Sequence, residues 1–90
     1  MKKLEIIISG RVQGVGYRYF TVHAAREFNI LGNTRNTTDG KVLVIAVGND
    51  SNMNLFIQEL RSGPRMAIVD EIKTTELSAV QNFSNFRIEY

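Results

Sequence analysis

A glycine-rich segment that ends in a basic residue is the part of this sequence whose residue types best fit a chemical role. Residues 10–18 read Gly-Arg-Val-Gln-Gly-Val-Gly-Tyr-Arg and lie between an apolar run and a segment with helical periodicity. Glycines let backbone N–H groups converge on one oxyanion, and a helix that follows adds the positive end of its dipole. Arg18 adds a planar cation in the first helical turn. The segment therefore predicts an anion-binding loop, and phosphate is its natural ligand.

This loop differs from the two commonest phosphate-binding motifs. It lacks the Gly-Lys-Ser/Thr ending of a P-loop and the Gly-x-Gly-x-x-Gly spacing of a dinucleotide site, so nucleotide binding has little support. A purely structural interpretation of the loop also stays open. In that interpretation the three glycines make a tight strand-to-helix turn, and Arg18 is a solvated surface charge.

Asn36 is the second residue with a candidate chemical role. It precedes the pair Asp39-Gly40, which favours a tight hairpin turn. An amide offers both a donor and an acceptor, so Asn36 can hold a water molecule and direct its lone pair towards phosphorus. The alternative is an asparagine that stabilises its own turn.

The absence of cysteine and the single histidine limit the possible chemistry. Without cysteine the chain has no disulfide, no thiolate nucleophile and no Cys-based metal site. His23 has no cluster of ligating residues at metal-site spacing, so we expect neither a metal ion nor another cofactor. As a rival phosphoenzyme nucleophile, His23 falls on the polar side of the predicted helix and away from the loop.

Length and charge place the chain among small globular proteins. It has 90 residues, 43% of them hydrophobic, and a formal net charge of +2, and we expect one domain over residues 1–90. The weak positive charge suits an anionic ligand but falls short of the dense basic patch that holds duplex nucleic acid. The apolar run 6–8 is too short for a signal core or a membrane span, so we expect a cytoplasmic protein without membrane contact.

Hydrophobic periodicity predicts five extended segments and two helices. Strand-like sequence covers residues 4–9, 30–37, 41–47, 66–75 and 84–90. Helical spacing begins at Tyr17 and ends near Asn29. A second helix begins at Asp50 or Ser51, either of which can cap it, and stops at Gly63.

The predicted order is strand, helix, strand, strand, helix, strand, with a short strand added at the end. This is the split βαβ, ferredoxin-like α+β pattern, in which an antiparallel sheet of four main strands carries both helices on one face. We expect a bulge near Asp70 and Glu71, where the apolar phase of the fourth strand breaks. In this layout the strand that carries Asn36 starts beneath the end of the first helix and can run back beside the glycine loop.

Together the two segments resemble the signatures of the acylphosphatase family. The first is residues 10–18, and the second is Arg35-Asn36-Thr37-Thr38-Asp39-Gly40. The similarity extends over nearly the whole chain, with further matches at Ala25, Phe28, Ile30, Gly32, Ser62-Gly63-Pro64, Ala67, Val69 and Phe86-Arg87-Ile88. Departures from the family pattern fall at Asn29, Asn33 and Arg65, outside the expected chemistry.

The resemblance implies hydrolysis of the carboxylic–phosphoric anhydride bond of an acyl phosphate, which releases a carboxylate and inorganic phosphate without a metal. It implies that Arg18 binds the phosphate and that Asn36 orients the attacking water. The backbone implied to wrap the phosphate oxygens is that of Gln13, Gly14, Val15, Gly16 and Tyr17. A small-molecule acyl phosphate is the expected ligand, and a monomer is the simplest expectation.

Two other classes of function stay open on the sequence. One is a ferredoxin-like binding or regulatory module for an anionic ligand or for RNA, which would stack bases on aromatic side chains of the central strands. Residues 6–8 and 42–47 contain no aromatic residue, which counts against RNA. The other is a regulatory or carrier domain of a larger protein, in which a linker or tail is usual.

Overall fold

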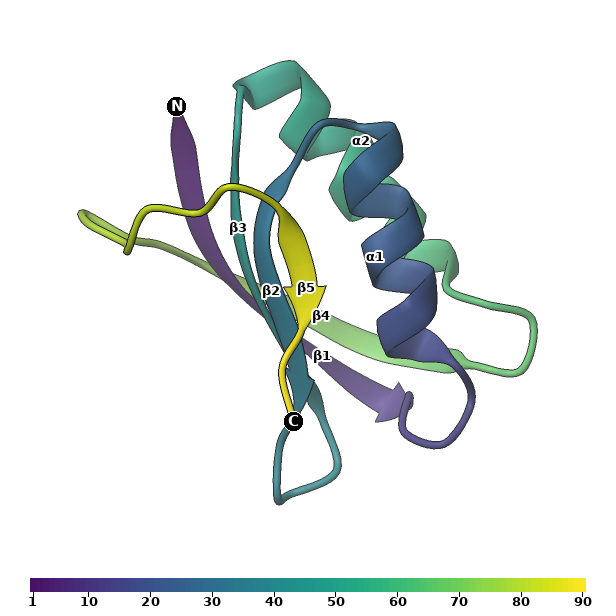
Figure 1. The fold of residues 1–90 in the computed structure, drawn as a ribbon. Helices are drawn as coiled ribbons and strands as arrows, with labels where there is room; N and C mark the ends of the chain where they lie inside the picture. Colours follow the sequence, from purple (N-terminus) through teal and green to yellow (C-terminus); the bar gives the residue numbers. More distant parts are fainter.

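One face of a five-stranded sheet is covered by both helices (Figure 1). The computed structural model describes residues 1–90. The elements are β1 (Lys2–Arg11), α1 (Tyr17–Glu27), β2 (Leu31–Asn36), β3 (Val42–Gly48), α2 (Asp50–Ser62), β4 (Ile68–Glu76) and β5 (Phe86–Ile88). The strand order across the sheet is β4-β1-β3-β2-β5. The predicted ferredoxin-like α+β fold is therefore confirmed.

The four longer strands pair antiparallel, as expected, whereas the short strand β5 runs parallel to its neighbour β2. The sheet is consequently mixed rather than purely antiparallel. In the β2–β5 pair, Gly32 lies opposite Phe86 and Thr34 lies opposite Ile88. The Phe86 side chain is buried, so this last strand closes one end of the core.

The centre of the sheet is the antiparallel pair of β1 and β3, in which Ile6 lies opposite Val44. Side chains alternate between the two faces of a strand, so every second residue of both strands points towards the helices. The buried set is Leu4, Ile6, Ile8, Val42, Val44 and Ala46. The alternation of apolar residues seen in the sequence thus gives the sheet an apolar face, and α1 and α2 pack against it.

Helix α1 begins at Tyr17 and places its small residues Ala24 and Ala25 against the sheet. Asn29 adopts the left-handed conformation, with φ of 56°, that ends the helix and turns the chain into β2. His23 is exposed, as its helical position predicts. Neither α1 nor α2 has the length and hydrophobicity of a bilayer-spanning helix.

The N-terminus of α2 differs from the prediction, because its cap is Asn49 rather than Asp50 or Ser51. The Asn49 Oδ1 atom accepts a hydrogen bond of 2.8 Å from the backbone N–H of Asn52. Asn49 has the extended backbone that a capping residue needs, and Asp50 already belongs to the helix. The predicted buried stripe is present, with Met53, Phe56 and Leu60 fully buried.

Strand β4 carries the predicted bulge. Ser9 of β1 pairs with Glu71, but the next residue, Gly10, pairs with Val69, so Asp70 is left without a partner. A bulge bends its strand and increases the local twist. This irregularity lies where β1 leaves the sheet and enters the glycine-rich loop.

Candidate active site

The glycine-rich loop, the β2–β3 hairpin and the C-terminus lie at the same end of the molecule, the lower end in Figure 1. The loop, residues 12–16, connects β1 to α1, and the hairpin turn, residues 37–41, connects β2 to β3. Hydrogen bonds between the Gln13 side chain and the hairpin show that the two segments touch. The fold thus brings together the two segments that the sequence analysis singled out.

The loop presents backbone N–H groups that have no acceptor in the protein backbone. Outside helices and strands the backbone forms 11 hydrogen bonds, and none of them is donated by residues 13–16. Gly14 and Gly16 have φ of 72° and 78°, in the left-handed region that L side chains rarely adopt. A Cβ atom on either glycine would meet no other atom within 4 Å, so backbone conformation is what requires glycine here. Val12 is buried and anchors the loop to the core.

Arg18 lies in the first turn of α1 and is partly buried. Its guanidinium carbon lies 5.3 Å from the centre of the Tyr90 ring. The guanidinium forms no ion pair, because the protein's one salt bridge joins Lys41 to Asp39. The first turn of α1 also contains no acidic residue, so the positive end of the helix dipole is not neutralised by the chain itself.

Asn36 is the last residue of β2, and its side chain is on the same face of the strand as that of Thr34, which is buried. The Asn36 Oδ1 atom is buried and accepts no hydrogen bond from the protein. A buried acceptor without a partner is uncommon in folded proteins and calls for an explanation. The Asn36 carboxamide therefore retains an acceptor that no protein group uses.

The hairpin turn is stabilised by Thr37 and not by Asn36. The Thr37 Oγ1 atom accepts a hydrogen bond of 2.9 Å from the Lys41 N–H and donates to the Asp39 carboxylate. The hydrogen bond from Thr37 is the main reason why the pKa of Asp39 is lowered, with a smaller contribution from the charge of Lys41. The interpretation of Asn36 as a residue that serves its own turn therefore has no hydrogen bond to support it.

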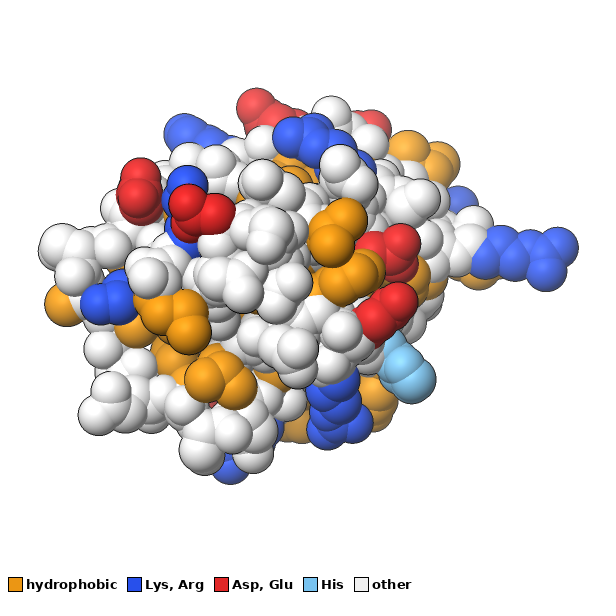
Figure 2. Space-filling view, turned by 90° about the horizontal axis from the view of Figure 1, so that it is seen from above, with side chains coloured by type: hydrophobic (Ala, Val, Ile, Leu, Met, Phe, Trp, Pro, Cys, Tyr) orange, Lys and Arg blue, Asp and Glu red, His pale blue; other side chains and the backbone are white.

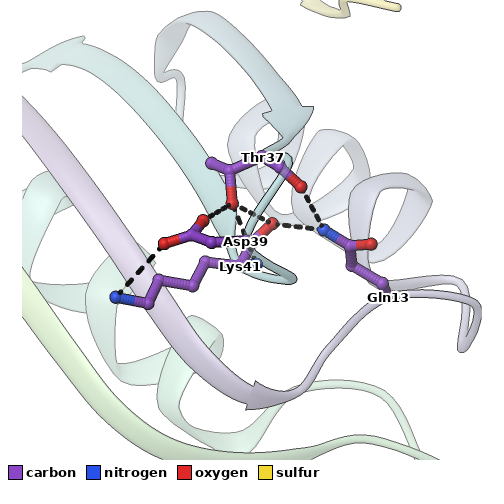
Figure 3. A network of polar contacts seen from close by, with 4 residues as sticks. All are labelled: Gln13, Thr37, Asp39 and Lys41. Carbon is purple, nitrogen blue, oxygen red and sulfur yellow. Dashed lines mark hydrogen bonds and ion pairs between the residues drawn. The ribbon is translucent and has the colours of Figure 1, made fainter.

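Gln13 has a side-chain role that the sequence analysis missed, because there only its backbone was assigned. Its Nε2 atom donates to the backbone oxygen of Thr37 at 2.9 Å and to that of Lys41 at 2.8 Å, as Figure 3 shows. The two acceptors are 24 and 28 residues away along the chain. No local spacing in the sequence signals such a contact.

Tyr17 fixes the start of α1 against the end of α2. Its phenol O–H donates a buried hydrogen bond of 2.6 Å to the backbone oxygen of Leu60. Burial raises the pKa of Tyr17, because the phenolate would lose its hydration. This contact fixes the helix turn that carries Arg18 relative to the rest of the fold.

The largest cavity, of about 500 Å³, lies elsewhere, on the face of the sheet that carries no helices. Its lining includes Glu5, Arg35 and Leu43 but neither Arg18, Asn36 nor any residue of the loop. Arg35 is the neighbour of Asn36, yet consecutive strand residues point to opposite faces. The loop and the hairpin therefore lie outside this cavity, and their exposed backbone N–H groups suit a small anion.

Comparisons with known proteins agree with one another. Residues 4–88 match the family model described as Acylphosphatase. A protein named Acylphosphatase from Archaeoglobus fulgidus is 42% identical over 92 residues, and one from Oceanobacillus iheyensis is 40% identical over 91 residues; both alignments cover 100% of each chain. The crystal structure of acylphosphatase from Bacillus subtilis superposes with a TM-score of 0.96 at 33% identity, covering 100% of both chains.

Proposed function

This chain belongs to the acylphosphatase family and is an acylphosphatase, a hydrolase, and on that premise we propose that Arg18, the loop backbone of residues 13–17 and Asn36 carry out its reaction. The substrate is an acyl phosphate, and the products are a carboxylate and inorganic phosphate. The observation that best supports this assignment is the contact of the loop with the hairpin through Gln13. The loop, whose residues 13–16 donate no backbone hydrogen bond, thus meets the turn that directly follows Asn36, whose buried Oδ1 atom has no partner.

The loop and Arg18 bind the phosphoryl group in this proposal. Residues 13–16 donate no backbone hydrogen bonds, so their N–H groups can point at phosphate oxygens. Arg18 has no carboxylate partner, so its guanidinium can form two parallel hydrogen bonds with the same anion. The dipole of α1 adds to the attraction, because no acidic side chain in its first turn opposes it.

An acyl phosphate needs little chemical assistance to lose its acyl group. When the bond between phosphorus and the acyl oxygen breaks, the leaving group is a carboxylate, a weak base, so no general acid has to protonate it. Phosphoryl transfer passes through a loose, in-line transition state with charge on the equatorial oxygens, and catalysis consists mainly of positioning and electrostatic stabilisation. The loop N–H groups and Arg18 supply that stabilisation without a metal ion or cofactor.

Asn36 orients the attacking water on the side of phosphorus opposite the leaving carboxylate. Its Oδ1 atom accepts a hydrogen bond from the water, which directs a lone pair of the water oxygen at phosphorus. The new bond between the water oxygen and phosphorus forms as the bond between phosphorus and the acyl oxygen breaks. A carboxamide is not a base, so the water proton passes to a phosphate oxygen.

The proposal also covers the wider properties of the protein. Residues 1–90 form one acylphosphatase-like domain that acts as a monomer in the cytoplasm, without nucleic-acid or membrane partners. The extent of the family match, residues 4–88, supports one domain. Size-exclusion chromatography with light scattering tests the monomer, and a mass twice that of the 10.2 kDa chain would refute it.

Binding of RNA has less support than catalysis. The side chains of β1 and β3 that point away from the helices include Glu5, Ile7, Leu43 and Ile45, and none of them is aromatic. At the end of the molecule opposite the loop and the hairpin, which Figure 2 shows, basic and acidic side chains are interspersed rather than separated by sign. No part of this end has the uniform positive charge that phosphate backbones favour.

Release of phosphate from benzoyl phosphate in the presence of EDTA tests the proposed mechanism. We expect the rate to be the same with and without the chelator. Loss of activity in EDTA that added divalent metal restores would refute the metal-independent mechanism. An RNA-binding titration at two salt concentrations is run in parallel, and tight RNA binding would support the other class of function.

A further inference from the structure

The side chain of Gln13 connects the two halves of the proposed site. Its carboxamide is a half-buried group whose Nε2 atom donates to the Thr37 oxygen at 2.9 Å and to the Lys41 oxygen at 2.8 Å. A primary amide has two N–H donors, and here both are used on the two backbone carbonyls at the base of one turn. Figure 3 shows this arrangement, with Gln13 approaching the turn from the loop.

The acceptors of Gln13 belong to a rigid part of the hairpin. The Thr37 N–H donates to the Lys41 oxygen at 2.9 Å, and the Lys41 N–H donates to Thr37 Oγ1 at 2.9 Å. Asp39 adds a hydrogen bond with Thr37 and a salt bridge with Lys41. Thr37 directly follows Asn36. Gln13 is therefore hydrogen-bonded to the residue next to the one whose amide is proposed to orient water.

No other hydrogen bond connects the loop to the hairpin. In the sheet, β1 and β2 are separated by β3, so no strand pairing joins the segments that carry Gln13 and Asn36. The pairing of β1 with β3 ends at Ile8 and Val42, before the loop begins. No backbone hydrogen bond joins residues 12–16 to residues 37–41. Apart from the sheet, in which Ile8 and Asn36 both pair with Val42, the Gln13 carboxamide is the one hydrogen-bonded connection between the loop and the hairpin.

We propose that Gln13 is a positioning residue for the reaction, which fixes the Asn36 amide relative to the phosphate loop through its hydrogen bonds to Thr37 and Lys41. The inference rests on the proposed function, because it needs Asn36 to orient the water. Gln13 acts through its side chain on the hairpin, while its backbone belongs to the loop. Misplacement of a reacting group by ~1 Å can cost roughly 100-fold in rate, so loss of this connection should lower turnover more than phosphate binding.

The substitution Gln13→Met tests the inference, because methionine has a similar length and no N–H donor. We expect kcat for benzoyl phosphate to fall by about tenfold or more, with KM and the inhibition constant of inorganic phosphate changed by no more than about twofold. Gln58→Met, on the exposed face of α2, is the matched control and should leave both constants unchanged. Circular dichroism and thermal unfolding establish that each variant is folded.

The decisive measurement is a double-mutant cycle with Asn36→Ala. If Gln13 acts by positioning Asn36, Gln13→Met lowers kcat by no more than about twofold when Asn36 is already alanine. The positioning role would be overturned if Gln13→Met lowered kcat equally in the wild type and in Asn36→Ala. It would also be overturned if Gln13→Met raised the inhibition constant of phosphate by as large a factor as it lowered kcat. Should Gln13→Met fail to fold, Gln13→Asn, which keeps the amide but shortens the side chain, enters the same cycle with the same expectations.

The cycle also separates this inference from the proposed function. Unchanged turnover in Asn36→Ala alone would refute the proposed role of Asn36, whatever Gln13 does. A large effect of Asn36→Ala together with unchanged turnover in Gln13→Met would refute only the role of Gln13.

Discussion

The guanidinium of Arg18 lies over the ring of Tyr90, the last residue of the chain, with its central carbon 5.3 Å from the ring centre. Tyr90 is 94% exposed, so its ring meets the cation at the protein surface. The neighbouring Tyr19 hydroxyl raises the pKa of Tyr90, and the charge of Arg18 opposes that rise. The C-terminus thus contributes directly to the surroundings of the proposed phosphate-binding cation.

The contact with Tyr90 should help to hold Arg18 in place, with a small effect. A cation–π contact at an exposed site is weak and corresponds to a factor of about two to five. We expect Tyr90→Ala to lower kcat/KM by about that factor and Tyr90→Phe, which keeps the ring, to leave it unchanged. Steady-state hydrolysis of benzoyl phosphate measures kcat/KM of both variants. An equal loss of kcat/KM in the two variants would show that the contact with the ring face does not cause the effect.

Removal of the Arg18 charge should weaken binding and catalysis together, because in the proposed mechanism the cation contacts the phosphate in the ground state and in the transition state. We expect Arg18→Met to raise the inhibition constant of inorganic phosphate by roughly 10- to 100-fold, which corresponds to the loss of about 1.5–3 kcal/mol of charged hydrogen bonding, and to lower kcat as well. Arg61→Met, in the exposed last turn of α2, controls for the change in net charge. Phosphate inhibition that is the same in Arg18→Met and in the wild type would exclude the phosphate role.

Substitution of Asn36 should affect turnover alone. Asn36→Ala removes the amide that is proposed to orient water but leaves the loop and Arg18 intact, so we expect kcat to fall by about 100-fold or more with little change in KM. Stopped-flow or steady-state phosphate release measures kcat, and thermal unfolding checks the fold. A rise in KM with normal kcat would instead assign Asn36 to substrate binding.

Tyr17 should make stability depend on pH in the alkaline range. Burial raises its pKa above the ordinary value of 10.0, so the folded state holds the phenol proton more tightly than the unfolded state. The stabilisation is complete below pH 10 and is lost progressively as the pH rises above 10, where the unfolded chain ionises first. Urea unfolding at pH 8 and at pH 11 should show this loss in the wild type.

The variant Tyr17→Phe is the control for that titration. At pH 8 it lacks the hydrogen bond to the Leu60 oxygen, and we expect its free energy of unfolding to be lower by about 0.5–1.5 kcal/mol. Between pH 8 and pH 11 its stability should change less than that of the wild type. Equal pH dependence in the two proteins would mean that other groups cause the alkaline loss.

Thr34→Val should stabilise the protein. The Thr34 Oγ1 atom is fully buried and has no hydrogen-bond partner, while valine has a similar shape without the polar atom. We expect the free energy of unfolding to rise by about 1–2 kcal/mol, the usual cost of burying an unpaired polar group. Chemical denaturation measures it, and a destabilised Thr34→Val would show that the hydroxyl has a partner in solution.

Periodicity predicted the fold because the strands and helices bury alternating or helically spaced apolar residues. Ile6 and Ile8 in β1 and Met53 and Phe56 in α2 follow those periods, and their burial is complete. The predicted cap of α2 was wrong because Asn49, Asp50 and Ser51 are consecutive residues of types that all favour the N-cap position. Nothing local distinguishes them, and tertiary structure decides where the extended chain turns into the helix.

The candidate site could be predicted in part. Glycines followed by Arg18 indicate an anion-binding loop by their chemistry, and their spacing near a helix N-terminus is local information. The side-chain role of Gln13 could not be predicted, because it depends on two carbonyls brought close only by the packed sheet. The unpartnered Asn36 Oδ1 atom is likewise a property of the folded protein, since its burial is set by the surrounding structure.

The central pairing of β1 with β3 joins parts of the chain that α1 and β2 separate, with Ile8 opposite Val42. Contacts between residues so distant in sequence form slowly, because a long loop must close before they are made. When the denatured enzyme is diluted into buffer, its activity should therefore return late in refolding, as the complete sheet forms. The central pair of strands is complete only when the chain has extended to residue 48, the end of β3.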